Sequence, residues 1–231
     1  MPMSQRNVSL LSALLSVIAG STDTIGYLGL HGLFTAQITG NLVIVAAHIT
    51  TGNPAITALL LAVPVFMLVL LGTSVLTTVL QHRHLPTLAP LLALELLLLI
   101  SFDALCVAAG SPFHLDAPRG VLAGMFGVAA MAVQSALVQT SLSGTPVTGV
   151  MTTNVTNFVL ALGQWLLPLR AGARAEAHRK AMRILPVIVG FMLGCALGAA
   201  AENAYGLRAL ALPAALAVLA LLMGLRLSAR G

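Results

Sequence analysis

The sequence predicts an all-α, polytopic helical membrane protein of about eight helical segments. The chain is 58% hydrophobic and only 7% charged, with a mean hydropathy of +1.01, whereas a soluble domain carries about 25% charged residues. Most of its apolar runs reach the roughly 20 residues that a membrane-spanning helix needs. Lipid offers no partner to exposed backbone amides, and runs such as LLALELLLLI lack the alternation of a β-barrel strand, so helices are expected.

The apolar runs follow one another along the chain and are separated by turn residues. Thr51-Gly52-Asn53-Pro54 predicts a tight turn, and Gly110-Ser111-Pro112 opens a longer loop. The second run is short for a crossing. The expected segments cover residues 8–33, 36–49, 55–80, 88–109, 121–142, 147–169, 181–201 and 207–225.

The two halves of the chain share residues at matching spacings. Pro64 and Gly72 are matched by Pro186 and Gly194 at the same spacing, and the pair Thr35 and Asn41 by Thr148 and Asn154; Pro90 and Pro213 follow the first prolines after twenty-six and twenty-seven residues. These matches predict one membrane domain, residues 1–231, made of a first repeat at 8–109 and a second at 121–227. Transporters commonly contain such repeats and hold their site at the repeat interface.

Lysine and arginine predict the orientation of the chain. If all eight segments cross, Arg83 and Arg208 lie outside; if 36–49 and 147–169 re-enter on one side and six cross, Arg119 replaces Arg83. Nine basic residues lie opposite two in both cases, so we expect the termini and a basic loop at 170–183 to be cytoplasmic. Four crossings in each half would make the repeats parallel, and three would make them inverted.

Polar residues concentrate at 19–41. Asp23, Tyr27 and His31 are spaced by four and predict one stripe on a helix. Asp23 falls near mid-membrane, where a carboxylate costs about 2.5–3.5 kcal/mol on insertion scales. Two hypotheses follow: a proton or cation site that also suits a cationic substrate, or a hydrogen bond that fixes helix packing. We interpret His31 as a neutral interfacial histidine.

A break is expected in the next segment, where Thr39-Gly40 interrupts a polar face. A broken helix exposes backbone groups that bind ions or substrates, and Gly40 equally suits close helix packing. We expect a substrate or ion site between the two halves, formed by Asp23, Tyr27, Thr39, Asn41, Gln134, Gln139, Asn154 and Asn157. Asp23 and Glu95 are the candidate proton carriers.

Motifs for catalysis and cofactor binding are missing from the sequence. No phosphate-binding loop, dinucleotide fingerprint, zinc-protease motif or serine-hydrolase motif occurs, and Cys106 and Cys195 stand alone in apolar runs. We expect no enzyme, no cofactor and no metal site. The net charge of +5 comes from residues at the ends of apolar runs, so no nucleic acid is expected. The expected partners are membrane lipid and a small-molecule or ion substrate, with oligomer formation left open.

A resemblance to a known family rests on Asp23, Gly26-Tyr27, Phe34, Thr39-Gly40-Asn41, Gln134 and Thr152–Asn154. With these residues the chain resembles the YoaK family of bacterial inner-membrane proteins, a domain-of-unknown-function family, across nearly its whole length. The chain differs from that family at two places. It has Gln134-Ser135 where the family usually has Gln-Asn, and Thr152-Thr153 where the family usually has a second Thr-Gly. The resemblance implies a multi-pass protein of a bacterial plasma membrane and no established activity.

Three functions are compatible with these features. The repeat, the broken segment and mid-membrane Asp23 favour a small secondary transporter or permease. A structural or accessory protein within a larger membrane complex would use the same polar residues for helix packing. A membrane-embedded lipid or quinone enzyme is disfavoured because no nucleophile–base pair is legible.

Overall fold

A computed structural model describes residues 5–52, 56–109, 115, 117–142, 145–146, 148–167 and 171–228. These residues form α-helices and one short 3-10 helix and no strand, which confirms the all-α class. The elements are α1 (Gln5–Gly29), α2 (Ile38–Thr51), α3 (Thr57–His82), α4 (Leu88–Ala109), α5 (Pro118–Ser141), α6 (Met151–Leu166), α7 (Ala171–Tyr205), η1 (Gly206–Leu210) and α8 (Ala211–Ser228).

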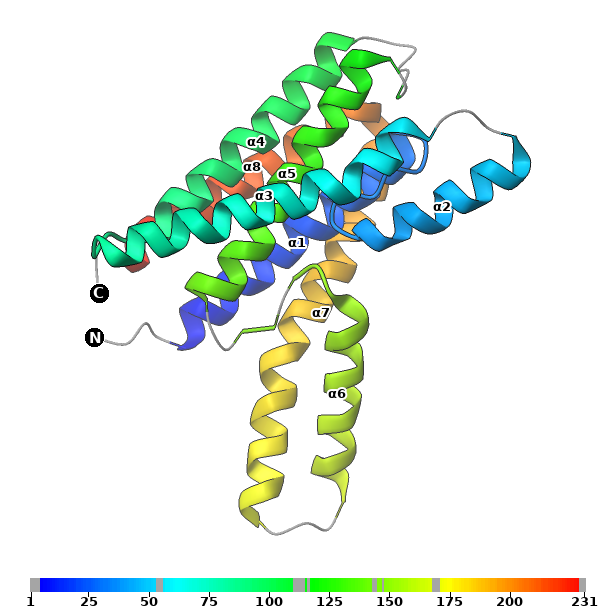
Figure 1. The fold of residues 1–231 in the computed structure, drawn as a ribbon. Coiled ribbons are helices and arrows are strands. Elements are labelled where there is room, and N and C mark those ends of the chain that lie inside the picture. Colours follow the sequence, from blue (N-terminus) through cyan, green and yellow to red (C-terminus); the bar gives the residue numbers. More distant parts are fainter. Residues whose placement is uncertain are drawn as a thin grey trace.

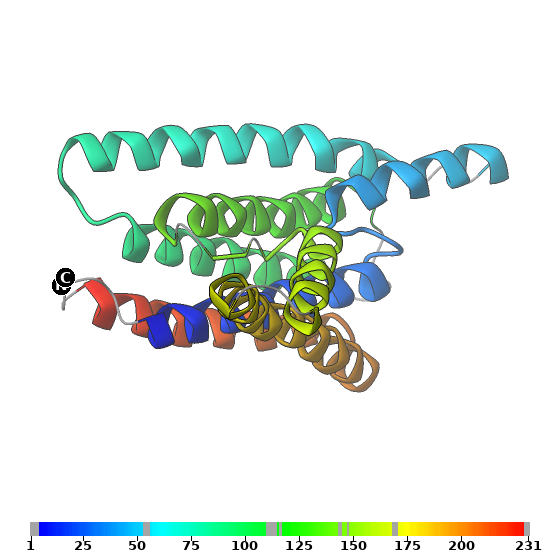
Figure 2. The ribbon, with the colours of Figure 1, turned by 90° about the horizontal axis from the view of Figure 1, so that it is seen from below.

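Six of these helices share one bundle. Viewed from below, α4 and α5 lie between α3 on one side and α1, α7 and α8 on the other (Figure 2). The start of α1 and the end of α8 lie at the same end of the bundle, α2 leaves it toward the other end, and α6 forms an arm with the first half of α7 (Figure 1). The two short helices, α2 and α6, therefore lie at the margins of this six-helix bundle.

The lengths and hydropathy of the helices identify a polytopic membrane protein. Five stretches are long and apolar enough to cross a membrane, namely 7–29, 57–82, 88–109, 118–141 and 172–228, the last of which contains both α7 and α8. Helices α2 and α6 have 14 and 16 residues, or about 21 and 24 Å, against a hydrocarbon core of about 30 Å. The helices found at the segments expected at 36–49 and 147–169 are thus shorter than the hydrocarbon core is thick.

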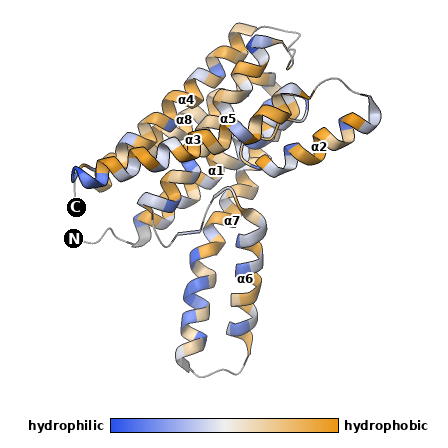
Figure 3. Ribbon diagram, in the orientation of Figure 1, coloured by the Kyte–Doolittle hydropathy of each residue, from blue (hydrophilic) through white to orange (hydrophobic). Residues whose placement is uncertain are grey.

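The basic run at 170–183 differs from the expected loop. Residues from Ala171 onward belong to α7, and hydrophilic residues gather on this first part of the helix, whereas the bundle is mostly hydrophobic (Figure 3). Alanine, arginine, lysine and glutamate dominate the run and are all strong helix formers, which explains why α7 extends ahead of its apolar part.

Close backbone contact joins α1 to α7. A Cβ added to Gly190, Gly194 or Gly198 would lie 2.6, 2.3 and 2.8 Å from backbone oxygens of α1. The three glycines are four residues apart and so share one face of α7. Small residues at this spacing let membrane helices approach closely, because lipid gives no hydrophobic force that drives helices together.

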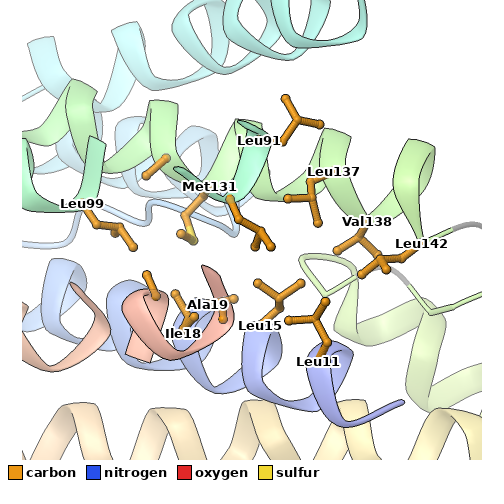
Figure 4. Packing of buried hydrophobic residues seen from close by; sticks show 14 of the residues in the cluster. Leu11, Leu15, Ile18, Ala19, Leu91, Leu99, Met131, Leu137, Val138 and Leu142 are labelled. Atoms are coloured by element: carbon orange, nitrogen blue, oxygen red, sulfur yellow. The ribbon is translucent and has the colours of Figure 1, made fainter. Parts of the chain in front are cut away.

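An apolar cluster fills the space between α1, α4, α5 and α8. Leu11, Leu15 and Ile18 from α1 meet Leu91 of α4 and Met131 of α5, all of them buried (Figure 4). The cluster packs the centre of the bundle with side chains from both halves of the chain.

Helix pairs in the two halves pack in matching ways. Helices α1–α4 of the first half correspond in order to α5–α8 of the second. The contact of α1 with α7 then matches that of α5 with α3, and the contact of α1 with α8 matches that of α5 with α4. The contact of α2 with α3 likewise matches that of α6 with α7. His84 and Gly206 lie twenty residues after Pro64 and Pro186 and have φ values of 54° and 59°. Helices α1 and α5 run in opposite directions (Figure 1). The two repeats stay a prediction; if the halves are repeats, this arrangement makes them an inverted pair.

Candidate functional site

The chain between α1 and α2 turns back into the bundle. Helix α1 ends at Gly29, and the left-handed residues His31 (φ 52°) and Gly32 (φ 101°) reverse the chain. The expected stripe of Asp23, Tyr27 and His31 is therefore wrong for His31, because the helix ends before it. Residues 33–37, named the first loop here, return beside the last turns of α1.

Asp23 holds the first loop against α1. Its Oδ1 accepts hydrogen bonds from the amides of Thr35 at 2.7 Å and Ala36 at 2.8 Å, with the Gln37 amide and the Thr35 hydroxyl each at 3.4 Å. Asp23 lies six residues before the end of α1, so the loop reaches about 9 Å back along the helix. The carboxylate thus sits just ahead of the first residue of α2, where the helix dipole favours negative charge.

Asn41 fixes the same loop from the other side. Its Oδ1 accepts the Phe34 amide and its Nδ2 donates to the Phe34 carbonyl, both at 2.8 Å. The Phe34 ring stacks on Tyr27 with centroids 4.8 Å apart, and a Cβ on Gly40 would come within 2.9 Å of that ring. Gly40 therefore makes room for the Phe34 ring of the first loop, so its described close contact is with a loop side chain.

The anchoring bonds of Asp23 offset the cost of placing a carboxylate in the membrane. Hydrogen bonds to a charged group contribute about 1.5–3 kcal/mol each, so the two short bonds to Oδ1 offset an insertion cost of about 2.5–3.5 kcal/mol. The second oxygen, Oδ2, is buried without a partner in the described structure. The anchoring bonds therefore use Oδ1, and Oδ2 remains for another partner.

Gln134 has a comparable position in the second half. Its Nε2 donates to the Thr148 hydroxyl at 2.8 Å and to the Leu15 carbonyl of α1 at 3.0 Å. Thr148 lies in the connection from α5 to α6, whose described residues 148–150 are named the second loop here. Gln134 therefore ties this loop to both α5 and α1, and its Oε1 is buried without a partner among the described residues.

The two loops approach each other inside the bundle. A Cβ added to Gly149 would lie 3.5 Å from the Ser135 hydroxyl and 3.9 Å from the Ala36 carbonyl oxygen. Gly149 belongs to the second loop and Ala36 to the first. Helices α2 and α6, which follow the loops, both begin within a few residues of this point and carry a buried asparagine, Asn41 or Asn154, as their fourth residue.

The structure separates the expected site residues into two groups. Asp23, Asn41, Gln134 and Asn154 are buried at or beside the loops. The remaining side chains are exposed or half-buried: Tyr27 and Thr39, Gln139 on the surface of α5, and Asn157 on α6. Of these, Tyr27 reaches the first loop through its stacking on Phe34. Their role as ligand contacts stays a prediction.

Glu95 lies apart from the loops, in the middle of α4. It is buried, and neither carboxyl oxygen has a partner in the described structure. Its buried neighbours on the same helix face are Leu91, Leu92 and Leu99. Nothing in the packing of α4 uses the carboxyl group.

Sequence reasoning missed the loop residues that receive the polar side chains. Thr35 and Thr148 were noted only as matching positions in the two halves, yet they are the partners of Asp23 and Gln134. The usable signal is their placement: each stands six residues before an asparagine and follows an apolar segment that contains Asp23 or Gln134.

Comparison with known protein families agrees with the family resemblance seen in the sequence. A family model described as protein of unknown function (DUF1275) matches residues 11–223. The chain belongs to this family, which confirms the resemblance to YoaK, itself a DUF1275 member. No curated protein and no solved structure matches the chain.

Proposed function

We propose that this member of the DUF1275 family is a small secondary transporter or permease whose substrate passes between the two loops. The observation that carries the proposal is the meeting of the two loops inside the bundle, each held by a buried polar side chain, Asp23 or Gln134. Transporters form their sites from discontinuous helices of this kind, at the interface of two repeats.

The matched packing of the two halves supports the proposal. In an inverted pair, the contact of α1 with α7 and that of α5 with α3 are alternatives that can exchange between two states. The first contact is closed by glycines against backbone, as at Gly194, whereas a Cβ on Gly72 of α3 would meet nothing within 4 Å. The matched glycines thus differ in their packing, because Gly194 lies in the contact of α1 with α7 and Gly72 is exposed.

The orientation forms part of the proposal. We propose a bacterial plasma membrane with both termini in the cytoplasm, because six crossings then place only Arg119 and Arg208 outside. The first part of α7, with its basic residues, lies on the cytoplasmic side in this arrangement.

A cross-link between the loops tests the proposal. Ala36→Cys combined with Gly149→Cys places two thiols where the loops meet, in a chain whose native Cys106 and Cys195 are replaced by alanine. Ligands are first found by thermal stabilisation of the purified protein and then tested for uptake into proteoliposomes. Uptake should stop on oxidation and return on reduction, whereas each single variant should be insensitive to oxidation. A ligand that binds but never enters the vesicles contradicts transport.

A second candidate is a structural or accessory membrane protein. It is favoured by the use that Asp23 and Asn41 make of their hydrogen bonds, which fix the first loop. In that case the protein should purify from its native membrane in a fixed ratio with a larger complex, and no screened ligand should stabilise it alone.

A further inference from the structure

The two side chains that hold the loops, Asp23 and Gln134, each keep one oxygen that makes no hydrogen bond. Asp23 leaves Oδ2 and Gln134 leaves Oε1 without a hydrogen bond in the described structure, with the Gln37 side chain beside the Asp23 carboxylate, although the two anchoring side chains are only 2% and 1% exposed. A buried acceptor without a partner costs about 1–3 kcal/mol, and native proteins contain few of them. Two such oxygens beside the two loops indicate that a ligand supplies the missing partner.

The chemistry of these atoms defines the ligand. All the buried side-chain atoms without partners among the described residues are oxygens, and they belong to Asp23, Glu95, Asp103 and Gln134. The basic residues whose side chains are described are all exposed: Arg83, Arg119, Arg174, Arg179, Lys180, Arg183, Arg208 and Arg226. The interior thus offers acceptors and no fixed positive charge in its described part, which attracts cations and disfavours anions.

Resting on the proposed permease function, we propose that Asp23 Oδ2 and Gln134 Oε1 bind a small monovalent cation, one at each loop. A single carboxylate at one position and a neutral amide at the other cannot balance a divalent ion, which takes about six to eight oxygen ligands in the case of calcium. No group of three or more histidine, cysteine or acidic residues that could hold a metal occurs among the described residues. Sodium, potassium and ammonium ions share the required chemistry.

The two oxygens mark successive positions along α1. Gln134 is tied to the Leu15 carbonyl, and Asp23 lies eight residues further along the helix, a rise of about 12 Å. The positions of the two side chains along α1 are therefore about two helical turns apart. An ion moving between the halves would meet the neutral amide oxygen of the second loop and the carboxylate of the first as separate steps.

Thermal unfolding in detergent tests the cation site. The purified protein is titrated with sodium, potassium or ammonium chloride, with choline chloride as the bulky-cation control at equal ionic strength. At least one small cation should raise the unfolding temperature in a saturable way beyond choline. Equal effects of all four salts, or a shift that follows the anion when sodium salts are exchanged, would overturn the proposal.

Variants separate the ligand role from the anchoring role. Asp23→Asn keeps Oδ1 for the loop amides but replaces Oδ2 by an NH₂ group, so the half-saturating concentration should rise about tenfold, the equivalent of one charge-assisted hydrogen bond. Gln134→Glu places a charge at the second loop and should lower that concentration. The matched control is Thr78→Val on the exposed surface of α3, whose hydroxyl donates to the Ser74 carbonyl of its own helix; it should keep the wild-type response. A wild-type response in Asp23→Asn and Gln134→Glu would refute the assignment.

Failure of the cation site and failure of the permease give different results. Cation stabilisation without any flux in proteoliposomes supports the site and removes transport. Flux of another ligand, with no saturable cation effect on unfolding, supports transport and overturns the cation site.

Discussion

The Oδ1 atom of Asp23 accepts a hydrogen bond from the Thr35 amide at 2.7 Å. This bond joins α1, at a point six residues before its end, to the loop that leads into α2. The same oxygen accepts the Ala36 amide at 2.8 Å. A residue expected as a mid-membrane charge is thus also the anchor of a returning loop. The anchoring bonds use Oδ1 and the proposed cation would bind Oδ2, so the two roles are separable by substitution.

Asp23→Ala should destabilise the protein by about 2–4 kcal/mol, because it leaves the Thr35 and Ala36 amides buried without an acceptor. Asp23→Asn keeps an acceptor at Oδ1 and should lose about half as much, since a neutral acceptor bonds roughly half as strongly as a charged one. Thermal or denaturant unfolding in detergent measures both. Equal losses for the two variants would show that the charge, and not the anchoring bonds, stabilises the loop.

Gly194→Ala should destabilise the contact between α1 and α7. The added Cβ would lie 2.3 Å from the Val17 carbonyl oxygen, and overpacking of this kind costs about 1–3 kcal/mol. Gly72→Ala is the matched control, because Gly72 stands at the corresponding place after Pro64 and has open space around it. It should be neutral or stabilise α3 by up to about 1 kcal/mol. The unfolding temperatures of the two variants, measured in the same detergent, give the comparison of their stabilities.

A cysteine at His84 should lie on the cytoplasmic side. Residue 84 belongs to the connection between α3 and α4, which lies at the same end of the bundle as the start of α1 (Figure 1). In a chain without Cys106 and Cys195, His84→Cys should react with a membrane-impermeant thiol reagent only after the cells are permeabilised. Arg208→Cys, at the other end of the bundle, should react in intact cells. The reverse pattern would contradict six crossings with cytoplasmic termini.

Glu95→Leu should raise the stability of the purified protein by about 1–3 kcal/mol, because it removes buried oxygens that have no partner in the described structure. Glu95→Gln should fold and insert like the wild type. Unfolding curves measured side by side give the comparison. A clear loss of stability in Glu95→Leu would instead reveal a bound partner of the carboxyl group, and a loss of uptake in Glu95→Gln alone would assign it to proton movement.

The sequence by itself determined the class of protein and most of the helices. The segment expected at 88–109 coincides with α4, and the one expected at 55–80 is shifted by two residues from α3. Such segments are legible because lipid requires long runs of apolar residues in helical form. The same constraint pointed to Asp23 as an exceptional residue.

Only the tertiary structure decided what the polar residues do. Gln139 and Asn157 follow helical spacing as well as Gln134 and Asn154 do, yet Gln139 is exposed and Asn157 only half-buried. Spacing predicts which residues share a face of one helix, but the partner of that face depends on how helices far apart in the chain pack. The bonds from Asp23 to the first loop and from Gln134 to Leu15 and Thr148 exist because the chain turns back after α1 and α5, and short polar loops inside a bundle leave no periodic trace in the sequence.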